Sequence, residues 1–538
     1  MEWNENEYLY ASRRNIVYGA HGMAATGQQL AAQAGLEILK KGGNAIDAAV
    51  AMAIALTVVE PTSNGIGGDA FALIWTKDGL EGLNSSGPAP MLASVEKIRA
   101  EGYEKMPVYG FHTVTVPGAP AAWKTLSEKY GKLSFKELFV PAVRYAKEGF
   151  AVPPVVAQMW QSEVDTHTRL HKGLAEYQSF FDTFTINGKA PEAGTYWKCE
   201  QQAETLEELA ETACESFYRG KIAEKIDSFS RKYHGELRKE DLEQYKPEWV
   251  KPISVSYRGY DVWEIPPNGH GIVALMALNI LKGFAFSKEE KELPRTYHRQ
   301  IEALKLAYED GKRYVAEPSY MKYTYEQLLS AEYAEKRRSL ITEQAILPAP
   351  GKPDSGGTVY LCTADDEGNM VSYIQSNYKM FGSGLVVPGT GISLHDRGNG
   401  FSLDSAMENR IAPGKRPYHT IIPGFLTKEG KPVGAFGVMG GFMQPQGHVQ
   451  VITNMIDFHL NPQQALNTPR WRWISEKKIE VERNFPKDVI EALQKMGHEV
   501  SVCDNVSTFG RGQIIVRNEN GIYAGGTEPR ADGAVLGY

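Results

Sequence analysis

Cysteine is scarce in this sequence. The chain has four in 538 residues, namely Cys199, Cys214, Cys362 and Cys503. So few thiols in a long chain argue against a disulfide framework, and no two of them have the spacing of metal ligands. Two hydrolase signatures are also missing, because there is no Gly-x-Ser-x-Gly motif and no His-Glu-x-x-His motif. We therefore expect neither a metal nor a cofactor.

The sequence also lacks an excess of positive charge and any long hydrophobic run. The net charge is −7, so nothing indicates a nucleic-acid partner. The most apolar run, Ala48–Val59, is shorter than the roughly 20 residues that span a bilayer. The N-terminus, Met1–Glu7, is acidic and has no apolar segment typical of a signal peptide. We expect a soluble cytoplasmic protein with no membrane partner.

The remaining composition is that of a globular protein, with 42% hydrophobic and 23% charged residues. A chain of 538 residues can bury a large core, and its length alone would suggest two or more domains. No internal repeat or low-complexity segment divides it.

The most informative stretch is Asp354–Tyr360, with the sequence DSGGTVY. The leader before it, Leu347–Pro353, is rich in proline and excludes a regular helix or a central strand. After it, the pattern predicts a strand over 358–363, a turn over 365–369 and a returning strand over 370–375. A threonine thus stands at the entrance of a hairpin behind two glycines, which suits a chain that is cut between Gly357 and Thr358.

The chemistry of such a cut explains why a threonine is needed. A threonine hydroxyl is a weak nucleophile, but at a new N-terminus the free α-amine of the same residue acts as its base. That amine has a reference pKa of about 8. The glycines let the backbone bend so that the hydroxyl reaches the preceding carbonyl. On the short motif alone, an ordinary Gly-Gly-Thr turn before a strand is the alternative.

The N-terminal part predicts two helices and a glycine-rich loop. Residues 24–42 have apolar side chains at helical spacing, and Asn44 is placed to cap a second helix over 45–59. The second helix is almost entirely apolar, which indicates a central, buried element. The loop Asn64–Phe71 leads into a strand over 71–75. Because it runs from helix to strand with no Lys-Ser/Thr behind it, a phosphate site is not expected.

Short motifs follow one another along almost the whole chain, from about residue 16 to 538. In order they are GGNAIDAA at 42–49, VPG at 116–118, FYRG at 217–220, PPNGHG at 266–271 and PRADG at 529–533. In this collinear order they resemble the gamma-glutamyltransferase family.

The resemblance implies a fold and a processing step. The family has an α+β fold, the N-terminal-nucleophile hydrolase sandwich, with two stacked antiparallel sheets between helical layers. Its members are proenzymes that cleave themselves before a threonine. By resemblance the scissile bond is Gly357–Thr358, and residues 1–538 form one domain that is processed into a large subunit, 1–357, and a small subunit, 358–538. The product is a heterodimer of the two self-cleaved subunits.

The resemblance also implies catalytic residues besides Thr358. Asn377 lies where the family has an asparagine that orients the threonine, although a turn asparagine is the plain alternative. Gly440 and Gly441 lie where the family has a glycine pair that forms the oxyanion hole. They follow a predicted strand and precede a helix predicted over 446–460, so their N–H groups suit that role. An ordinary strand-to-helix turn is again the alternative.

The residues expected to bind the acyl group depart from the family pattern. Ser86 takes the place of the arginine that holds the α-carboxylate of a gamma-glutamyl group. Arg397 and Gly400 take the places of the acidic or amide pair that holds its α-ammonium, with Asn399 beside them. His419 and Thr420 replace two serines.

One further departure lies close to the nucleophile. Gln375 stands at the place of the second threonine near the reacting residue. We expect the substrate to be bound by these residues together: Ser86, Gln375, Arg397, Asn399, His419 and Thr420.

Three functions remain open at this point. The first is an autoprocessed amidohydrolase and gamma-glutamyltransferase that acts on gamma-glutamyl amides such as glutathione. It would form an acyl-enzyme on Thr358, with water or an amino acid as acceptor. The second is an acylase resembling the glutaryl-cephalosporin acylases, in which Arg397 attracts a terminal carboxylate. The third is a non-catalytic binding or structural relative, against which Thr358, Asn377 and the Gly440–Gly441 pair argue.

Overall fold

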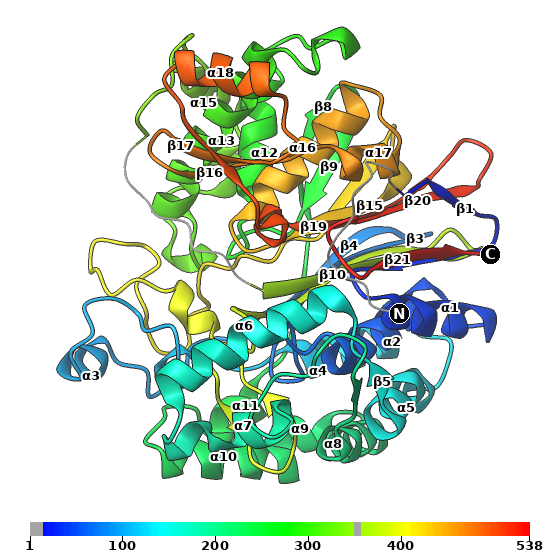
Figure 1. Cartoon of the computed structure of the whole chain (residues 1–538), viewed down its shortest axis with the longest axis vertical. Coiled ribbons are helices and arrows are strands. Elements are labelled where there is room, and N and C mark those ends of the chain that lie inside the picture. The colour runs from blue at the N-terminus through cyan, green and yellow to red at the C-terminus, as the bar shows by residue number, and fades with distance from the viewer. Residues whose placement is uncertain (1–13, 349–356) are drawn as a thin grey trace, which may run out of the picture.

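A computed structural model describes residues 14–348 and 357–538. Two seven-stranded sheets lie face to face between two layers of helices (Figure 1). All neighbouring strands within each sheet are antiparallel. This arrangement confirms the predicted sandwich.

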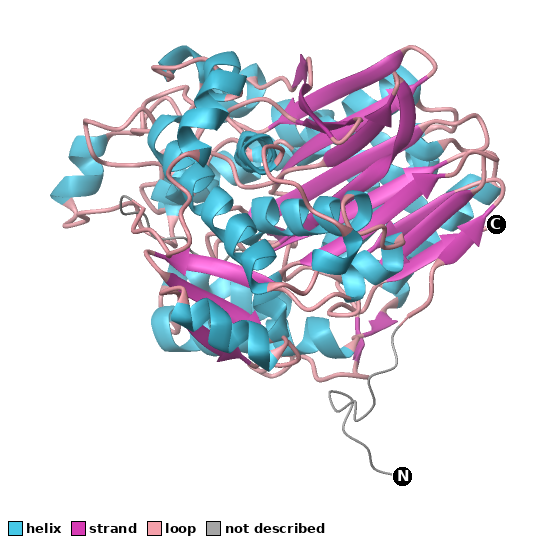
Figure 2. Cartoon of the chain, turned by 90° about the horizontal axis from the view of Figure 1, so that it is seen from above, coloured by secondary structure: helices cyan, strands magenta, loops and turns pink. Residues whose placement is uncertain are grey.

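The first sheet carries the predicted nucleophile strand, β10, next to its central strand. Its order is β21 (Ala534–Gly537), β2 (Met23–Thr26), β10 (Gly357–Ala364), β11 (Met370–Tyr378), β3 (Asp69–Thr76), β4 (Gly79–Ser85) and β7 (Glu248–Val250). The order of the second sheet is β1 (Val17–Gly19), β20 (Tyr523–Thr527), β19 (Arg511–Arg517), β15 (Lys431–Met439), β14 (Gly424–Lys428), β9 (Tyr260–Glu264) and β8 (Ile253–Tyr257). Figure 2 shows the strands running side by side.

Both sheets draw strands from each side of the predicted cut. In the first sheet, β10 pairs on one side with β2, which precedes the cut, and on the other with β11, which follows it. In the second sheet, β14 pairs with β9 in the same way. The two predicted subunits therefore share one fold.

The space between the sheets is filled by side chains that alternate along the strands. Phe71, Tyr360 and Ile374 from the first sheet meet Phe425 and Ile515 from the second. The two sheets approach closely at Gly437, where an added Cβ would lie 2.4 Å from the ring of Tyr360. A glycine is needed there for the tyrosine to pack flat.

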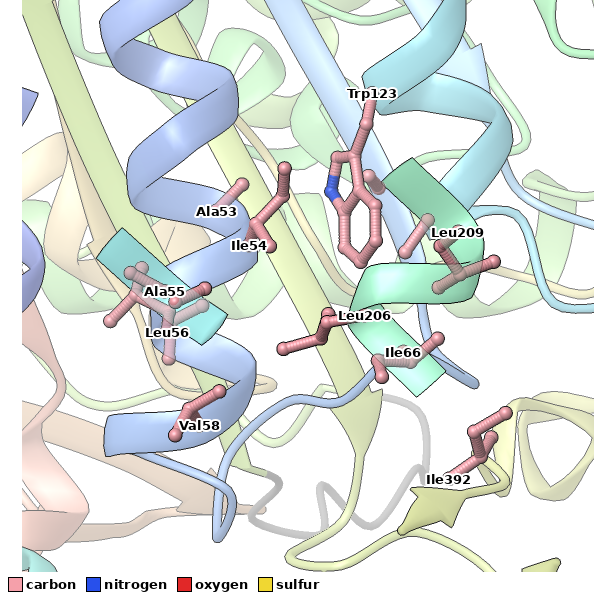
Figure 3. Packing of buried hydrophobic residues seen from close by; sticks show 14 of the residues in the cluster. Ala53, Ile54, Ala55, Leu56, Val58, Ile66, Trp123, Leu206, Leu209 and Ile392 are labelled. Carbon is pink, nitrogen blue, oxygen red and sulfur yellow. The ribbon is translucent and has the colours of Figure 1, made fainter. Parts of the chain in front are cut away.

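The outer face of the first sheet is covered by α1 (Gln29–Lys40), α2 (Ala45–Val59), α4 (Ala119–Tyr130), α5 (Val140–Glu148) and α8 (Glu200–Glu211). Every residue of α2 is buried, as its apolar sequence predicts, and Asn44 caps it through a capping box with Asp47. In Figure 3, Ala53 and Ile54 of α2 lie near Trp123 of α4 in this core.

The outer face of the second sheet is covered by α12 (Gly271–Leu281), α16 (Met443–Ile456) and α17 (Pro462–Asn467). Outside them, α13 (Pro294–Tyr314) packs against α12 and α16, and α18 (Lys487–Lys495) packs against α13. All of α12 is buried and α16 is buried over most of its length. Across the described ranges, no helix is both long and apolar enough to span a membrane.

One sequence prediction is wrong. Residues 24–26 were expected to begin a helix, but Met23–Thr26 form strand β2, and α1 begins at Gln29. Alanine favours helices in isolation. Here Ala24 and Ala25 pair with Thr363 and Cys362 of β10, so tertiary pairing overrides that preference.

The hairpin after the predicted cut is confirmed, with β11 longer than expected. Strand β10 ends at Ala364 and β11 begins at Met370. Asp365 fixes the turn, since its Oδ1 accepts hydrogen bonds from the backbone N–H groups of Glu367 and Asn369. The returning strand continues to Tyr378, three residues beyond the predicted end. Helix α16 likewise starts at Met443, three residues before the predicted start, and ends at Ile456 rather than Leu460.

Candidate active site

Thr358 is the second residue of β10 and is 1% exposed. Its Oγ1 lies 3.1 Å from Oγ of Ser376 on the neighbouring strand. The register of β10 and β11 is irregular here, because Gly357 pairs with Tyr378 whereas Val359 pairs with Gln375. The irregularity brings the side chain of Thr358 against that of Ser376.

Strand alternation sets the direction in which Thr358 faces. Thr358 shares a strand face with Tyr360, whose ring packs on Gly437 of the opposite sheet. Tyr360 Oη lies 2.7 Å from Oγ of Ser372, which shares a face of β11 with Ser376. The two hydroxyl pairs therefore line the space between the sheets, and Thr358 lies at its edge.

The predicted oxyanion hole lies at the end of β15, three residues beyond Gly437. Gly440 and Gly441 have φ angles of 135° and 57°, in the region that favours glycine. An added Cβ at Gly440 would lie 3.1 Å from Cα of Gly510. Helix α16 begins at Met443 directly behind the pair. Neither glycine N–H donates a hydrogen bond to another described residue, so both are available to an oxyanion.

Asn377 follows Ser376 and is fully buried. Within the described ranges, neither its Oδ1 nor its Nδ2 has a hydrogen-bond partner. The glycine-rich loop surrounds this amide: an added Cβ would lie 3.0 Å from Nδ2 at Gly65 and 2.9 Å from Oδ1 at Gly68. The loop that does not suit a phosphate thus makes room for the side chain of Asn377.

A buried carboxylate organises the predicted acyl-binding residues. Asp69 of β3 receives Arg397 Nε at 3.0 Å and Nη2 at 3.3 Å, and His419 Nε2 lies 2.7 Å from its Oδ2. His395 Nδ1 lies 3.3 Å from the same oxygen. Burial alone would raise the pKa of Asp69, but Arg397 and the two histidines together hold it well below its usual value. Asp69 is therefore ionised.

The charge of Arg397 is consequently paired. Its Nη1 donates to Thr420 Oγ1 at 2.8 Å, and its guanidinium lies 4.4 Å from the ring centre of Tyr378. The expectation of a free cation at Arg397 that attracts a substrate carboxylate is corrected by this geometry, because Asp69 already neutralises it. His419 is uncharged at neutral pH, since burial and the nearby Arg397 lower its pKa to about 4.

Two more predicted substrate residues are engaged by their neighbours. Ser86 Oγ donates to Asn84 Oδ1 at 2.7 Å and accepts from Asn268 Nδ2 at 3.3 Å. Asn399 Nδ2 donates to the carbonyl of Pro107 at 2.7 Å. Both side chains hold loops together in this structure.

Gln375 lies on the opposite face of β11 from Ser376. Its Oε1 accepts from Trp123 Nε1 and Tyr373 Oη, each at 2.9 Å, and its Nε2 donates to Asn64 Oδ1 at 2.7 Å and to the carbonyl of Ala53 at 3.3 Å. The amide has thus used its two acceptor and two donor positions. The structure does not bring Gln375 together with Thr358.

Sequence reasoning missed Ser376 and Asp69. Ser376 could have been found from the sequence. Side chains alternate between the two faces of a strand, so if Gln375 faces away from Thr358, the next residue, Ser376, faces it. Asp69 ends the glycine-rich loop, but its partners Arg397 and His419 are more than 300 positions away, so no local pattern reveals the ion pair.

A second polar cluster has residue types that suit a metal. His298, Glu302 and His498 are buried, with ligand atoms within 4.8 Å of one another. However, His298 Nδ1 and His498 Nε2 are joined by a hydrogen bond of 2.8 Å, and the ammonium of Lys305 lies 2.7 Å from Glu302 Oε1. The carboxylate of Glu302 is therefore already paired with a lysine, and its charge is balanced within the protein.

Comparison with known proteins matches residues 31–538 to the family described as gamma-glutamyltranspeptidase. A glutathione hydrolase-like YwrD proenzyme of Bacillus subtilis (strain 168) is 36% identical over 530 residues, which cover 97% of this chain and 99% of the relative. An oxamate amidohydrolase proenzyme of Klebsiella pneumoniae subsp. pneumoniae is 32% identical over 531 residues, covering 96% of this chain and 98% of that one. The structure of a cephalosporin acylase from Bacillus halodurans is 57% identical, with a TM-score of 0.97, and the match covers 100% of this chain and 99% of that chain.

Proposed function

Because the chain belongs to the gamma-glutamyltranspeptidase family, we propose that it is an autoprocessed amidohydrolase and acyltransferase whose nucleophile is Thr358. Family membership sets aside the non-catalytic alternative. The observation that carries the assignment of the nucleophile is the position of Thr358: buried at the start of β10, one bond after Gly357, with its hydroxyl 3.1 Å from that of Ser376.

Processing uses the same hydroxyl as catalysis. Thr358 Oγ1 attacks the carbonyl carbon of Gly357, and the peptide C–N bond breaks as its nitrogen takes a proton and becomes the free α-amine of Thr358. Water then hydrolyses the resulting ester, which releases the carboxylate of Gly357 and restores the hydroxyl. The cut separates residues 1–357 from 358–538.

Turnover then follows from the new terminus. The α-amine takes the proton of Thr358 Oγ1 as the oxygen attacks the substrate amide, and Gly440 and Gly441 donate their N–H groups to the oxyanion. In this proposal Asn377, whose amide has no hydrogen-bond partner among the described residues, orients the threonine as the corresponding asparagine of the family does. The amine leaves with the proton, and water or an amino acid takes the acyl group from Thr358.

We propose gamma-glutamyl amides such as glutathione as the primary substrates, in keeping with the similarity to the glutathione hydrolase-like proenzyme of Bacillus subtilis. In this proposal the acyl group lies against the Asp69–Arg397 pair, His419 and Thr420. Because Asp69 and Arg397 neutralise each other, they contribute a buried ion pair to this region and not a free charge for either end of the acyl group.

A second candidate is an acylase that cleaves glutaryl amides. It is favoured by Ser86 at the place of the carboxylate-binding arginine and by 57% identity to a cephalosporin acylase. A glutaryl group has no ammonium, so it does not need the anionic partner that Gly400 fails to supply. If this second candidate is correct, kcat/KM for a glutaryl anilide should exceed that for a gamma-glutamyl anilide by about tenfold, the effect of one charge-assisted hydrogen bond. A gamma-glutamyl preference of a hundredfold or more would contradict the glutaryl assignment.

The nucleophile is tested by intact mass and by activity on the same panel of glutathione and the two anilides. Wild-type protein is expected to resolve into two chains that meet at Gly357 and Thr358. Thr358→Ala is expected to remain one chain and to lose turnover by about a millionfold, as when a catalytic nucleophile is removed. An active enzyme that stays uncut would overturn the proposal.

A further inference from the structure

Arg511, the first residue of β19, lies beside the predicted oxyanion turn, Gly440–Gly441. Its backbone pairs with that of Met439 on β15, the residue directly before the turn. Gly510, which precedes Arg511, also lies against the turn, because an added Cβ at Gly440 would be 3.1 Å from its Cα. The main chain at Arg511 is therefore fixed against the predicted oxyanion donors.

The side chain of Arg511 points toward the first sheet. Arg511 pairs with Met439, which is two positions after Gly437 on β15, so Arg511 and Gly437 share a face of the second sheet. Gly437 identifies that face, since an added Cβ there would meet the ring of Tyr360 in the first sheet. From this face the guanidinium of Arg511 reaches the loop that follows α2.

The loop after α2 provides two acceptors for the guanidinium. Arg511 Nη1 donates to Glu60 Oε1 at 3.1 Å, and Nη2 donates to Ser63 Oγ at 3.4 Å. The carbonyl of Ser63 in turn accepts the backbone N–H of Asn377 at 3.4 Å. One guanidinium thus links the loop that holds Asn377 to the strand pair that ends at Gly440.

The Glu60–Arg511 ion pair crosses the predicted cut and is buried. Glu60 precedes the cut and its side chain is 2% exposed, whereas Arg511 follows the cut and its side chain is 6% exposed. Burial raises the pKa of Glu60, although Arg511 opposes that shift. Among the described residues, neither Glu60 Oε2 nor Arg511 Nε has a hydrogen-bond partner. A buried ion pair that leaves an acceptor and a donor unused is a poor source of stability, which favours a role in the reaction.

We propose that Arg511 is a positioning residue for the reaction at Thr358. Through the loop Glu60–Ser63 it keeps the amide of Asn377 and the oxyanion donors of Gly440 and Gly441 at the separation that the reaction requires. The inference rests on the proposed function. It also gives the large subunit a part in the chemistry, because a loop of that subunit connects two groups of the small subunit.

The test compares Arg511→Met with the double variant Glu60→Met/Arg511→Met, on protein that intact mass shows to be cut. The substrate is the amide of the panel that wild-type protein cleaves fastest. Arg511→Met leaves Glu60 buried without its partner, so the urea midpoint of unfolding should fall at a fixed protein concentration. The double variant replaces both charges by apolar side chains, and its midpoint should return close to that of wild type.

Turnover should not return with stability. In both variants kcat should be about tenfold to a hundredfold lower than in wild type, the effect of misplacing a reacting group by about 1 Å. KM should stay within about twofold, because Arg511 contacts none of the proposed acyl-binding residues and acts only on the chemical step.

Arg258→Met is the matched control. Arg258 Nε lies 3.0 Å from Asp457 Oδ1, so this ion pair also crosses the predicted cut. It lies at the end of β8, four strands from β19 in the second sheet. Its loss should lower the urea midpoint and leave kcat unchanged.

Two outcomes would overturn the role of Arg511. If the double variant regains the kcat of wild type together with its urea midpoint, the ion pair is only structural. If KM rises while kcat is kept, Arg511 acts in binding and not in positioning. Wild-type turnover separates this inference from the proposed function. An active wild type with an equally active double variant overturns only the role of Arg511, whereas a wild type that cleaves no amide of the panel overturns the proposed function and this role with it.

Discussion

Two regions of the molecule differ in whether their buried polar groups have hydrogen-bond or ion-pair partners. In the proposed catalytic set, the side-chain amide of Asn377 and the N–H groups of Gly440 and Gly441 have no hydrogen-bond partner among the described residues. Around Asp69, in contrast, Arg397 is held by an ion pair and by a hydrogen bond to Thr420. Since unpartnered buried groups are costly, they are expected where a substrate completes them. This contrast supports our proposal that the first region is the reaction centre, and it makes the Asp69–Arg397 pair a structural element of the fold.

The largest effect is expected from breaking the buried Asp69–Arg397 ion pair. Asp69→Asn leaves the guanidinium of Arg397 buried without its counter-ion, so the free energy of unfolding should fall by about 3–5 kcal/mol. Denaturant unfolding measures this change. Asp366→Asn, an exposed turn carboxylate, is the control and should be neutral.

The pH dependence of the difference in free energy of unfolding between wild type and Asp69→Asn gives a further check. The pKa of Asp69 is lowered on folding, so its stabilisation is fully present above the unfolded pKa of about 3.9 and is lost as the pH falls through the folded pKa. The gap between wild type and Asp69→Asn should therefore narrow only below about pH 4. A constant gap down to pH 2 would mean that the charge of Asp69 is not responsible.

The second effect concerns the reaction centre. Gly441→Val forces a branched side chain onto a φ of 57° and displaces a predicted oxyanion donor, so kcat should fall about a hundredfold to a thousandfold. Gly430→Val is a matched control, because Gly430 also has a positive φ, in the turn between β14 and β15, with nothing within 4 Å of an added Cβ. If both variants retain full kcat, the oxyanion hole lies elsewhere.

The smallest effect is expected from substitutions that compare the two faces of β11. Ser376→Ala removes the hydroxyl beside Thr358 and should slow both processing and turnover by about threefold to tenfold, the value of one neutral hydrogen bond. Gln375→Met acts on the other face and should lower stability by about 1–3 kcal/mol while leaving kcat of the folded enzyme unchanged. The opposite pattern would place Gln375, not Ser376, at the reaction centre.

Some features of the fold and of the candidate site could be predicted from the sequence, and others could not. The hairpin at Thr358, the buried helix α2 and the glycine pair before α16 follow from local patterns, and the structure has them. Local patterns did not find strand β2, because its pairing with β10 decides its conformation. They also missed the neutralisation of Arg397, since Asp69 lies 328 positions away.

Strand β10 lies between β2 and β11, and this position changes how the unfolding of the mature enzyme depends on protein concentration. Before the cut, unfolding is a reaction of one molecule, and its midpoint is independent of protein concentration. After the cut, the same hydrogen-bonded sheet joins two chains, so complete unfolding produces two molecules and the midpoint rises with concentration. Refolding then becomes an encounter between partners, and each chain alone lacks neighbours for its central strands. The proenzyme therefore folds as one chain, whereas the two separated subunits can refold only by associating with each other.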